Sequence, residues 1–191
     1  MKTGQIIFFN GASSSGKTTL AKVLQEKLEE PYIYVSMDNF INLYPEKYLN
    51  PTNQEEMQIT WQLILNVISG MTKSLAALAK TGNNIILDHL LREEGWLEDC
   101  VESWQGLDVL FIGLRCPLEV LEQREKERGD RNIGNARYQF DRVHRHGIYD
   151  LELDTSVLDV DECVNRIMLL IGEKPGETAF EKLQNQMSLA E

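Results

Sequence analysis

The chain has 191 residues, enough for one domain with a sizeable core, and its formal net charge of −11 argues against general affinity for nucleic acid or anionic membranes. No apolar run reaches the roughly 18 residues of a membrane span, and the N-terminal run is too short for a secretory signal. The three cysteines show no metal-binding spacing, so we expect a cytoplasmic protein without a disulfide framework.

Apolar runs alternate with amphipathic segments along the chain. The expected strands are Gln5–Asn10, Tyr32–Met37, Asn84–Leu87, Leu107–Leu114 and Tyr149–Leu153. The expected helices are Lys17–Glu29, Asp38–Leu43, Glu55–Lys80, Glu93–Trp104, Pro117–Glu127, Asn135–Arg145, Asp159–Ile171 and Glu177–Met187. Strands separated by helices predict an α/β three-layer fold, with a five-stranded parallel sheet and helices on both faces. We expect residues 1–172 to form this domain and residues 173–191 to form a helical tail.

A segment rich in glycine and serine follows the first expected strand. Its letters GASSSGKT fit the P-loop pattern G-x-x-x-x-G-K-[ST], and they stand between a strand and a helix, as phosphate binding requires. Small residues let backbone N–H groups approach a phosphate, while the lysine reaches the β- and γ-phosphates and the threonine hydroxyl ligates Mg²⁺. The pattern predicts an ATP and Mg²⁺ site made of Gly11, Ala12, Ser13, Ser14, Ser15, Gly16, Lys17, Thr18 and Thr19.

Two aspartates follow later strands, at the sheet edge where ligands of such folds bind. Asp38 is either the base that takes the proton of a substrate hydroxyl or the N-cap of the next helix, and the two roles are compatible. Asp88 ends the run IILD, which resembles a Walker B segment, so it is a candidate Mg²⁺ ligand beside Thr18; a loop or cap role is the alternative. His89 is adjacent, and we assign no metal to it.

Seven of the nine arginines lie between Arg115 and Arg145. Gly129 interrupts the helical pattern here, which predicts a mobile lid over residues 126–137. Lid arginines would neutralise the charge on a transferred phosphoryl group, and Arg128 and Arg131, which flank the glycine, are the candidates. The alternative is a solvated helix with Glu–Arg pairs.

The acceptor would enter between the second strand and the lid. Phe40, Tyr44 and Trp61 are candidates for the pocket wall, although a core position is the favoured reading for each of them. Residues 43–56 read as an irregular loop that contributes to an acceptor site.

Several segments together resemble the chloramphenicol phosphotransferase-like family. They are NGASSSGKT, SMDNF, IILDH, LDVLFIGLRCP, REKERGDRNIG and VHRHGIYDLELDTS, and the resemblance runs from about residue 6 to residue 171. It implies phosphorylation of a small-molecule hydroxyl by ATP and Mg²⁺, with Asp38 as catalytic base, the P-loop on the phosphates, and Arg128 and Arg131 in the lid. It also implies that the segment after Asp154 helps to bind adenine.

The sequence therefore predicts an ATP-dependent phosphotransferase with lysine and arginines at the transferred group. Chloramphenicol or a related alcohol is the expected acceptor. Residues 39–61, which should shape the acceptor pocket, do not match the antibiotic enzyme, so the resemblance carries over the ATP chemistry more safely than the acceptor. The alternatives are a P-loop kinase for another metabolite and a regulatory nucleotide-binding ATPase. The expected partner is a small molecule, with no nucleic acid and no membrane, and the sequence does not predict an oligomeric state.

Overall fold

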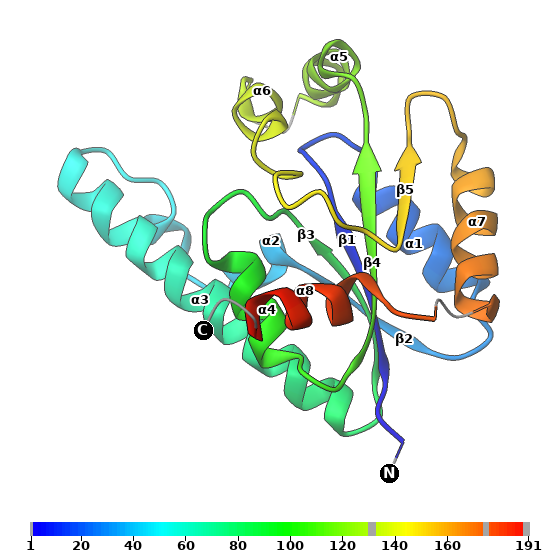
Figure 1. Cartoon of the computed structure of the whole chain (residues 1–191). Helices are drawn as coiled ribbons and strands as arrows, with labels where there is room; N and C mark the ends of the chain where they lie inside the picture. The colour runs from blue at the N-terminus through cyan, green and yellow to red at the C-terminus, as the bar shows by residue number, and fades with distance from the viewer. Residues whose placement is uncertain (1, 130–132, 174–175, 189–191) are drawn as a thin grey trace.

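Five parallel strands form the centre of the molecule, in the order β2-β3-β1-β4-β5 (Figure 1). The computed structural model describes residues 2–129, 133–173 and 176–188. The strands are β1 Gln5–Asn10, β2 Tyr32–Ser36, β3 Asn84–His89, β4 Asp108–Arg115 and β5 Leu151–Asp154. In the register of the central strands, Ile7 lies opposite Ile86 on one side and Leu110 on the other. This sheet confirms the predicted fold class.

Helices cover both faces of the sheet and give the fold its three layers (Figure 1). One face carries α1 Lys17–Lys27 and α7 Val160–Glu173, and the other carries α3 Gln54–Lys80, α4 Trp96–Ser103 and α8 Ala179–Ser188. The short α2 Met37–Ile41 and the 3-10 helix η1 Glu46–Tyr48 precede α3, whereas α5 Leu118–Arg128 and α6 Asn135–Phe140 stand above the carboxyl ends of the strands.

Strand β1 shows why the expected strands read as unbroken apolar runs. Ile6 and Phe8 point into the core shared with α3, α4 and α8, while Ile7 and Phe9 point into the core shared with α1 and α7. All four side chains are fully buried. A strand covered on both faces has no solvent side, so it needs no polar alternation.

Two segments join the larger core in ways that bear on the sequence analysis. Helix α3 is long and apolar enough to cross a membrane by length and composition alone, but Met71 and Leu75 on it are fully buried against the sheet. Helix α8 lies within the predicted tail, and its Phe180 stacks on Trp104 at 5.6 Å between ring centroids. The tail helix thus packs on the same core as the rest of the chain.

Most helix boundaries differ from the predicted ones by a few residues, as at α1, α4 and α6. Helix α1 ends at Lys27 because Leu28 is already extended, and α4 begins only at Trp96 because Gly95 before it is left-handed, with φ of 83°. Helix α6 ends at Phe140 rather than continuing to residue 145. Turns replace the helix there: the Arg142 amide donates to the Gln139 carbonyl, and the Arg145 amide to the Arg142 carbonyl.

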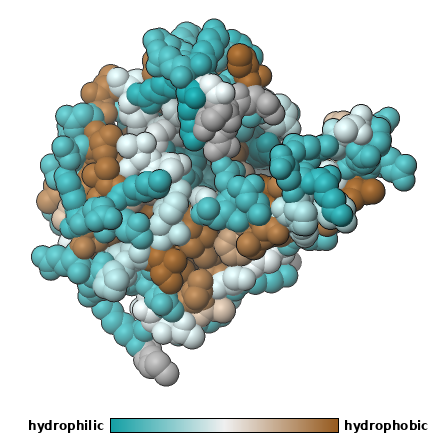
Figure 2. Space-filling model, turned by 180° about the vertical axis from the view of Figure 1, so that it is seen from behind, coloured by the Kyte–Doolittle hydropathy of each residue, from teal (hydrophilic) through white to brown (hydrophobic). Residues whose placement is uncertain are grey.

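Helices α5 and α6 overlap the two ends of segment 126–137, which the arginines predict as a lid, and we call these two helices the lid region. Beneath them, Ala12, Cys116, Leu121, Ala136 and Val143 form a small separate core that joins the lid to the P-loop. The outer surface of this region is hydrophilic, as the top of the molecule in Figure 2 shows. The lid therefore rests on an apolar base and presents charge to solvent.

Candidate active site

The P-loop adopts a backbone that favours anion binding. Ser14 has φ of 64°, making it the one residue other than glycine with a left-handed backbone in the part of the chain described, and Gly16 follows with φ of 89°. A Cβ at Gly11 would lie 2.7 Å from Ser15 Oγ and 2.8 Å from the Leu114 carbonyl oxygen, so only glycine fits there. Turns of this kind point successive N–H groups into one concavity.

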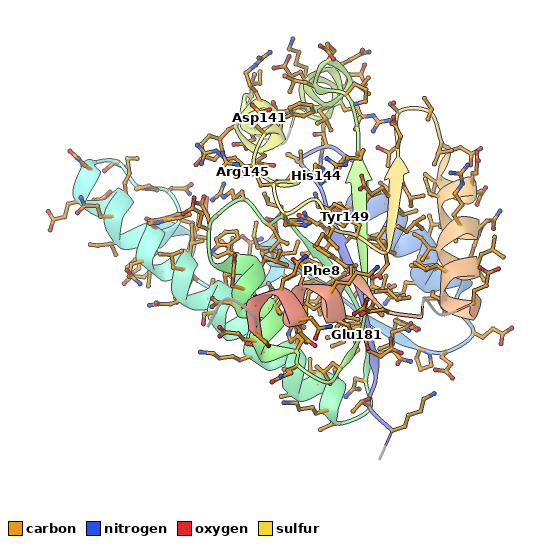
Figure 3. All side chains as sticks on the ribbon, in the orientation of Figure 1. Phe8, Asp141, His144, Arg145, Tyr149 and Glu181 are labelled. Carbon is orange, nitrogen blue, oxygen red and sulfur yellow. The ribbon has the colours of Figure 1, made fainter. Side chains whose placement is uncertain are left out.

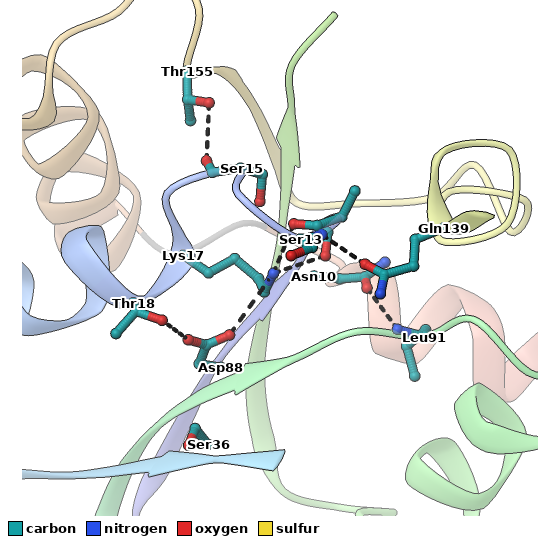
Figure 4. Close-up of polar contacts among 12 residues, drawn as sticks. Asn10, Ser13, Ser15, Lys17, Thr18, Ser36, Asp88, Leu91, Gln139 and Thr155 are labelled. Atoms are coloured by element: carbon teal, nitrogen blue, oxygen red, sulfur yellow. Dashed lines mark hydrogen bonds and ion pairs between the residues drawn. The ribbon is translucent and has the colours of Figure 1, made fainter. Parts of the chain in front are cut away.

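Several polar groups of the loop are held by distant segments (Figure 4). The Ser13 amide donates to Gln139 Oε1 at 2.7 Å, and Thr155 Oγ1 donates to the Ser15 carbonyl at 2.9 Å. The hydroxyl oxygens of Ser14 and Ser15 are buried without a hydrogen-bond partner among the described residues. Buried hydroxyls of this kind fit a bound anion that would satisfy them.

Lys17, Thr18 and Asp88 converge at the start of α1. Thr18 Oγ1 donates to Asp88 Oδ2 at 2.6 Å, and Lys17 Nζ lies 4.0 Å from Asp88 Oδ1 (Figure 4). The lysine also donates to the carbonyl oxygens of Gly11 and Ala12 at 2.8 and 3.0 Å. A hydroxyl and a carboxylate at hydrogen-bonding distance are oxygen ligands of the kind that Mg²⁺ takes together with water and phosphate.

Tyr34 completes the surroundings of Asp88. Its hydroxyl donates to Asp88 Oδ2 at 3.2 Å, and burial, followed by the charge of Asp88, raises the pKa of this phenol. Tyr34 therefore stays protonated near neutral pH and orients the carboxylate without competing for a cation. Sequence reasoning missed this residue, because the sequence of β2 alone does not show which of its side chains lies beside Asp88.

Asp38 is the second residue of α2 and lines the same cavity as the P-loop. Ser36, not Asp38, is the N-cap: the Asn39 amide donates to the Ser36 hydroxyl, and the Asn39 side chain accepts from the Ser36 amide. The structure thus removes the capping alternative for Asp38. Asp38 is half-buried, and Lys17 and Thr18 belong to the lining of the same cavity.

A cavity of about 390 Å³ lies on the nucleotide side of the loop. It is lined by Gly16, Thr18 and Thr19 of the P-loop, by Arg124 and Arg128 of α5, and by Thr155 and Leu158 after β5. Arg124 donates to the Thr155 carbonyl at 2.8 Å, so this arginine joins the lid to the segment after β5. Of the two predicted lid arginines, Arg128 lines this cavity and the acceptor cavity, whereas Arg131 lies outside the described residues.

Two buried polar side chains hold the lid in place, and sequence reasoning missed both. Glu125, 1% exposed, accepts from the amides of Gly134 and Ala136 at 2.8 and 2.9 Å and so bridges α5 and α6. Gln139, 4% exposed, is the acceptor for the Ser13 amide. Both residues act through contacts between different elements, and a single sequence does not show such contacts.

Asn10 joins the P-loop to the segment after α6. Its Nδ2 donates to the Tyr149 hydroxyl at 2.7 Å, and its Oδ1 accepts from the Leu91 amide at 2.9 Å. His144 Nδ1 lies 2.6 Å from the same hydroxyl, and Figure 3 shows both side chains on the segment below α6. Burial, followed by the charges of Arg115 and His146, lowers the pKa of His144 to about 3.

A second cavity, of about 760 Å³, includes P-loop residues in its lining and lies where the acceptor was expected, so we call it the acceptor cavity. Its walls come from α2, the segment at Leu49 and Asn50, Ile64 of α3, the end of β3 and Gln139 of α6. Leu49 and Asn50 belong to the irregular loop that was expected here. Phe40 and Trp61 instead pack against the larger core.

The end of β3 contributes an aromatic and cationic wall. The Arg92 guanidinium lies 5.5 Å from the Trp61 ring centroid and 5.9 Å from that of Trp96. His89 stacks on Trp96 at 5.5 Å between centroids, and burial, followed by the charges of Lys17 and Arg92, lowers the pKa of His89 to about 3. Its imidazole is therefore neutral throughout the physiological range. No group of three or more histidine, cysteine or acidic side chains in the described residues has metal-binding geometry.

The sequence matches the model of the family described as "Chloramphenicol phosphotransferase-like protein" over residues 4–171. The chain is 27% identical to "Putative O-phosphotransferase Rv2636" of Mycobacterium tuberculosis over 203 residues, covering 97% of this chain and 90% of that protein.

Solved kinases share the fold. The APS kinase CysC of M. tuberculosis superposes with a TM-score of 0.67 at 16% identity, covering 90% of this chain and 99% of its own. A gluconokinase from Sinorhizobium meliloti superposes with a TM-score of 0.61 at 15% identity, covering 99% and 98%. The chain is thus a small-molecule kinase with a P-loop kinase fold, and it belongs to the chloramphenicol phosphotransferase-like family.

Proposed function

We propose that the chain transfers the γ-phosphoryl group of ATP to a hydroxyl of a small molecule, with chloramphenicol or a related alcohol as the acceptor. One observation carries this proposal: a single cavity brings together the P-loop, Asp38, Asp88 and Arg128. Phosphoryl transfer needs a phosphate cradle, cations on the transferring group and a base near the attacking hydroxyl, and these groups supply each of them.

The residues present fit ATP and Mg²⁺. The left-handed Ser14 and Gly16, with the two unpartnered serine hydroxyls, suit the phosphates, and the cavity beside Arg124 and Thr155 suits the nucleoside. Thr18 and Asp88 would hold Mg²⁺, which would supply positive charge to offset that of the phosphates. The expected adenine contact after Asp154 belongs to this proposal, since Thr155 and Leu158 line that cavity.

A residue of this chain is assigned to each step of the phosphoryl transfer. Asp38 accepts the proton of the acceptor hydroxyl while its oxygen attacks the γ-phosphorus in line. The bond from the γ-phosphorus to the bridging oxygen breaks, and ADP leaves with that oxygen. Lys17 and Arg128 neutralise the charge on the transferring group, and the sequence adds Arg131 to this role.

The test is acceptor-dependent formation of ADP. Purified protein with ATP and Mg²⁺ is given chloramphenicol, D-gluconate or adenosine 5′-phosphosulfate in turn, and the product is identified by mass spectrometry. We expect a mass gain of one phosphoryl group on chloramphenicol and little ADP without acceptor. Product only with another compound would reassign the acceptor, and ADP formation that ignores every acceptor would favour a regulatory ATPase.

A further inference from the structure

Arg92, in the segment after β3, is a cation on the wall of the acceptor cavity that no step of the proposed transfer uses. Among the described residues it lines the acceptor cavity and not the cavity on the nucleotide side. Its side chain keeps 21% exposure, so a molecule in the cavity can reach it. Arginine is charged at every physiological pH, and this permanent charge therefore faces the acceptor rather than ATP.

Three aromatic rings from three helices hold the guanidinium in place. Its central carbon, Cζ, lies 5.5 Å from the ring centroid of Trp61 in α3. The same carbon lies 5.9 Å from the ring centroids of Trp96 in α4 and Tyr138 in α6. Ring faces attract a cation but offer no strong acceptor for its N–H groups, so this arrangement fixes the guanidinium without satisfying its donors.

The hydrogen-bonding capacity of Arg92 is largely unused. The one carboxylate beside it in the described part of the chain is Glu93, whose Oε1 lies 3.3 Å from Arg92 Nε. That contact lacks hydrogen-bond geometry, since Nε is buried without a hydrogen-bond partner. The two terminal nitrogens of Arg92 make no hydrogen bond to a described residue either, but they are not enclosed as Nε is. Open terminal nitrogens on a fixed guanidinium suit an oxyanion, which can accept two parallel hydrogen bonds from them.

Packing alone does not explain an arginine at this position. A methionine would fill the space among the three rings, and it would not bring a charge with unsatisfied donors into a partly buried site. The formal net charge of the chain is −11, so a cation kept on the cavity wall also opposes the general repulsion that an anionic ligand meets. Both points favour a negatively charged partner that enters from the cavity.

We propose that Arg92 is a specificity residue that binds an anionic group of the acceptor, a carboxylate or a phosphate, away from the hydroxyl that is phosphorylated. This inference rests on the proposed phosphotransferase function and narrows its acceptor. The preferred acceptor is an alcohol that carries an oxyanion, and chloramphenicol, which has no ionised group, is a slower substrate.

The test compares charged and uncharged acceptors on two skeletons. The first set is D-glucitol, D-gluconate and D-glucitol 6-phosphate, and the second is chloramphenicol and its analogue with a carboxylate in place of the nitro group. In at least one set we expect kcat/KM of the unaltered protein to be at least about ten-fold higher for an anionic member than for the uncharged one. The carboxylate and phosphate arms identify the anion that fits. Equal or higher kcat/KM for the uncharged member of both sets would overturn the inference.

Variants assign the preference to the guanidinium. Arg92→Met fills the same space without charge, so it should raise KM for the preferred anionic acceptor by about ten-fold or more and leave the uncharged one within about two-fold. The Kd for ATP with Mg²⁺ should not change, because Arg92 does not line the nucleotide-side cavity. Arg92→Lys keeps the charge without the planar fork, should retain part of the preference, and replaces Arg92→Met if that variant does not fold. Glu93→Gln removes the competing carboxylate and should lower KM for the anionic acceptor by about two-fold or more.

A second arginine on the same ring is the matched control. Arg142 Cζ lies 4.2 Å from the Tyr138 centroid, but Arg142 is not among the residues lining the acceptor cavity, so the preference should persist in Arg142→Met. An unchanged preference in Arg92→Met would make Arg92 a packing residue and would overturn this inference alone. Failure of the unaltered protein to phosphorylate any alcohol, despite binding ATP, would overturn the proposed function first.

Discussion

The nucleotide side and the acceptor side of the site are built in different ways. On the nucleotide side, nine consecutive residues supply most of the phosphate-facing groups, chiefly through the backbone at Ser14 and Gly16. On the acceptor side, side chains from α2, α3, α6 and the end of β3 each contribute one part of the wall. A ligand contacted by backbone leaves a sequence motif, whereas a ligand contacted by scattered side chains leaves none.

The largest expected effect tests whether chemistry can be separated from nucleotide binding. Asp38→Asn removes the proposed base but keeps the shape of the side chain, so kcat should fall by about 10²–10⁴-fold. The Kd for ATP, measured by isothermal titration, should stay within about two-fold, because Asp38 lines only the acceptor cavity of the two. Unchanged turnover would remove Asp38 from the mechanism.

Lys17→Ala should impair both phosphoryl transfer and ATP binding. Loss of the charge at the transferring group is expected to lower kcat by about 10²–10³-fold and to weaken ATP binding as well. Both are measured by steady-state kinetics and ATP titration. Lys27→Ala on the same helix is the control, since Lys27 forms an exposed ion pair with Asp161 and should leave both values unchanged. A normal ATP titration for Lys17→Ala would count against the assignment of the loop.

Glu125→Gln tests the lid that spans the two sides. Glutamine can accept only one of the two amide hydrogen bonds that the buried carboxylate accepts, so we expect a loss of about 1.5–3 kcal/mol in the free energy of unfolding. The kcat should fall by about ten-fold as Arg128 loses its support. The control is Glu122→Gln, whose partner Arg137 is largely exposed, and which should change neither quantity by much. Equal stability of the two variants would remove Glu125 from this role.

The smallest expected effect is a pH dependence of stability caused by His144, which lies behind the P-loop and away from both ligands. The pKa of His144 is lowered to about 3 in the folded chain. Its imidazole therefore takes up a proton near pH 6.5 in the unfolded chain but not in the folded chain. Stability is therefore complete above pH 6.5 and falls as the pH drops toward 3. The slope should stay below about 1.4 kcal/mol per pH unit, since the ring is partly exposed.

Denaturant titrations between pH 7 and pH 5 measure that slope. His144→Asn should reduce the slope without abolishing it, because the pKa of His89 is also lowered to about 3 and contributes with the same sign. An identical slope in the variant would assign the pH dependence to other groups.

The fold was predictable because its signals are local. Strand β1 is apolar at every buried position that faces a helix layer, and the P-loop needs glycine at positions 11 and 16 for reasons of backbone shape. The hydrogen bond from Asn10 to the Val143 carbonyl was not predictable, because the two residues are 133 positions apart in the chain. The same holds for much of the candidate site, where Gln139 meets Ser13 across 126 residues.

The acceptor wall was the least predictable part. Trp61 was a candidate for the pocket but packs on the core beneath Arg92, and the residues that do line the cavity, such as Leu49 and Ile64, carry no chemical signature. Only the cap at Ser36 had a readable pattern, since a serine followed three residues later by an amide side chain favours a helix start.

The bond between Gln139 and Ser13 limits how this enzyme can be re-engineered. Gln139 lines the acceptor cavity, yet its Oε1 is the acceptor for an amide of the phosphate loop. A substitution chosen there to admit a bulkier alcohol would release that loop amide at the same time and change the handling of ATP. Leu49, Asn50 and Ile64 line the same cavity from segments outside the phosphate loop, so libraries that aim at new acceptors are best placed there.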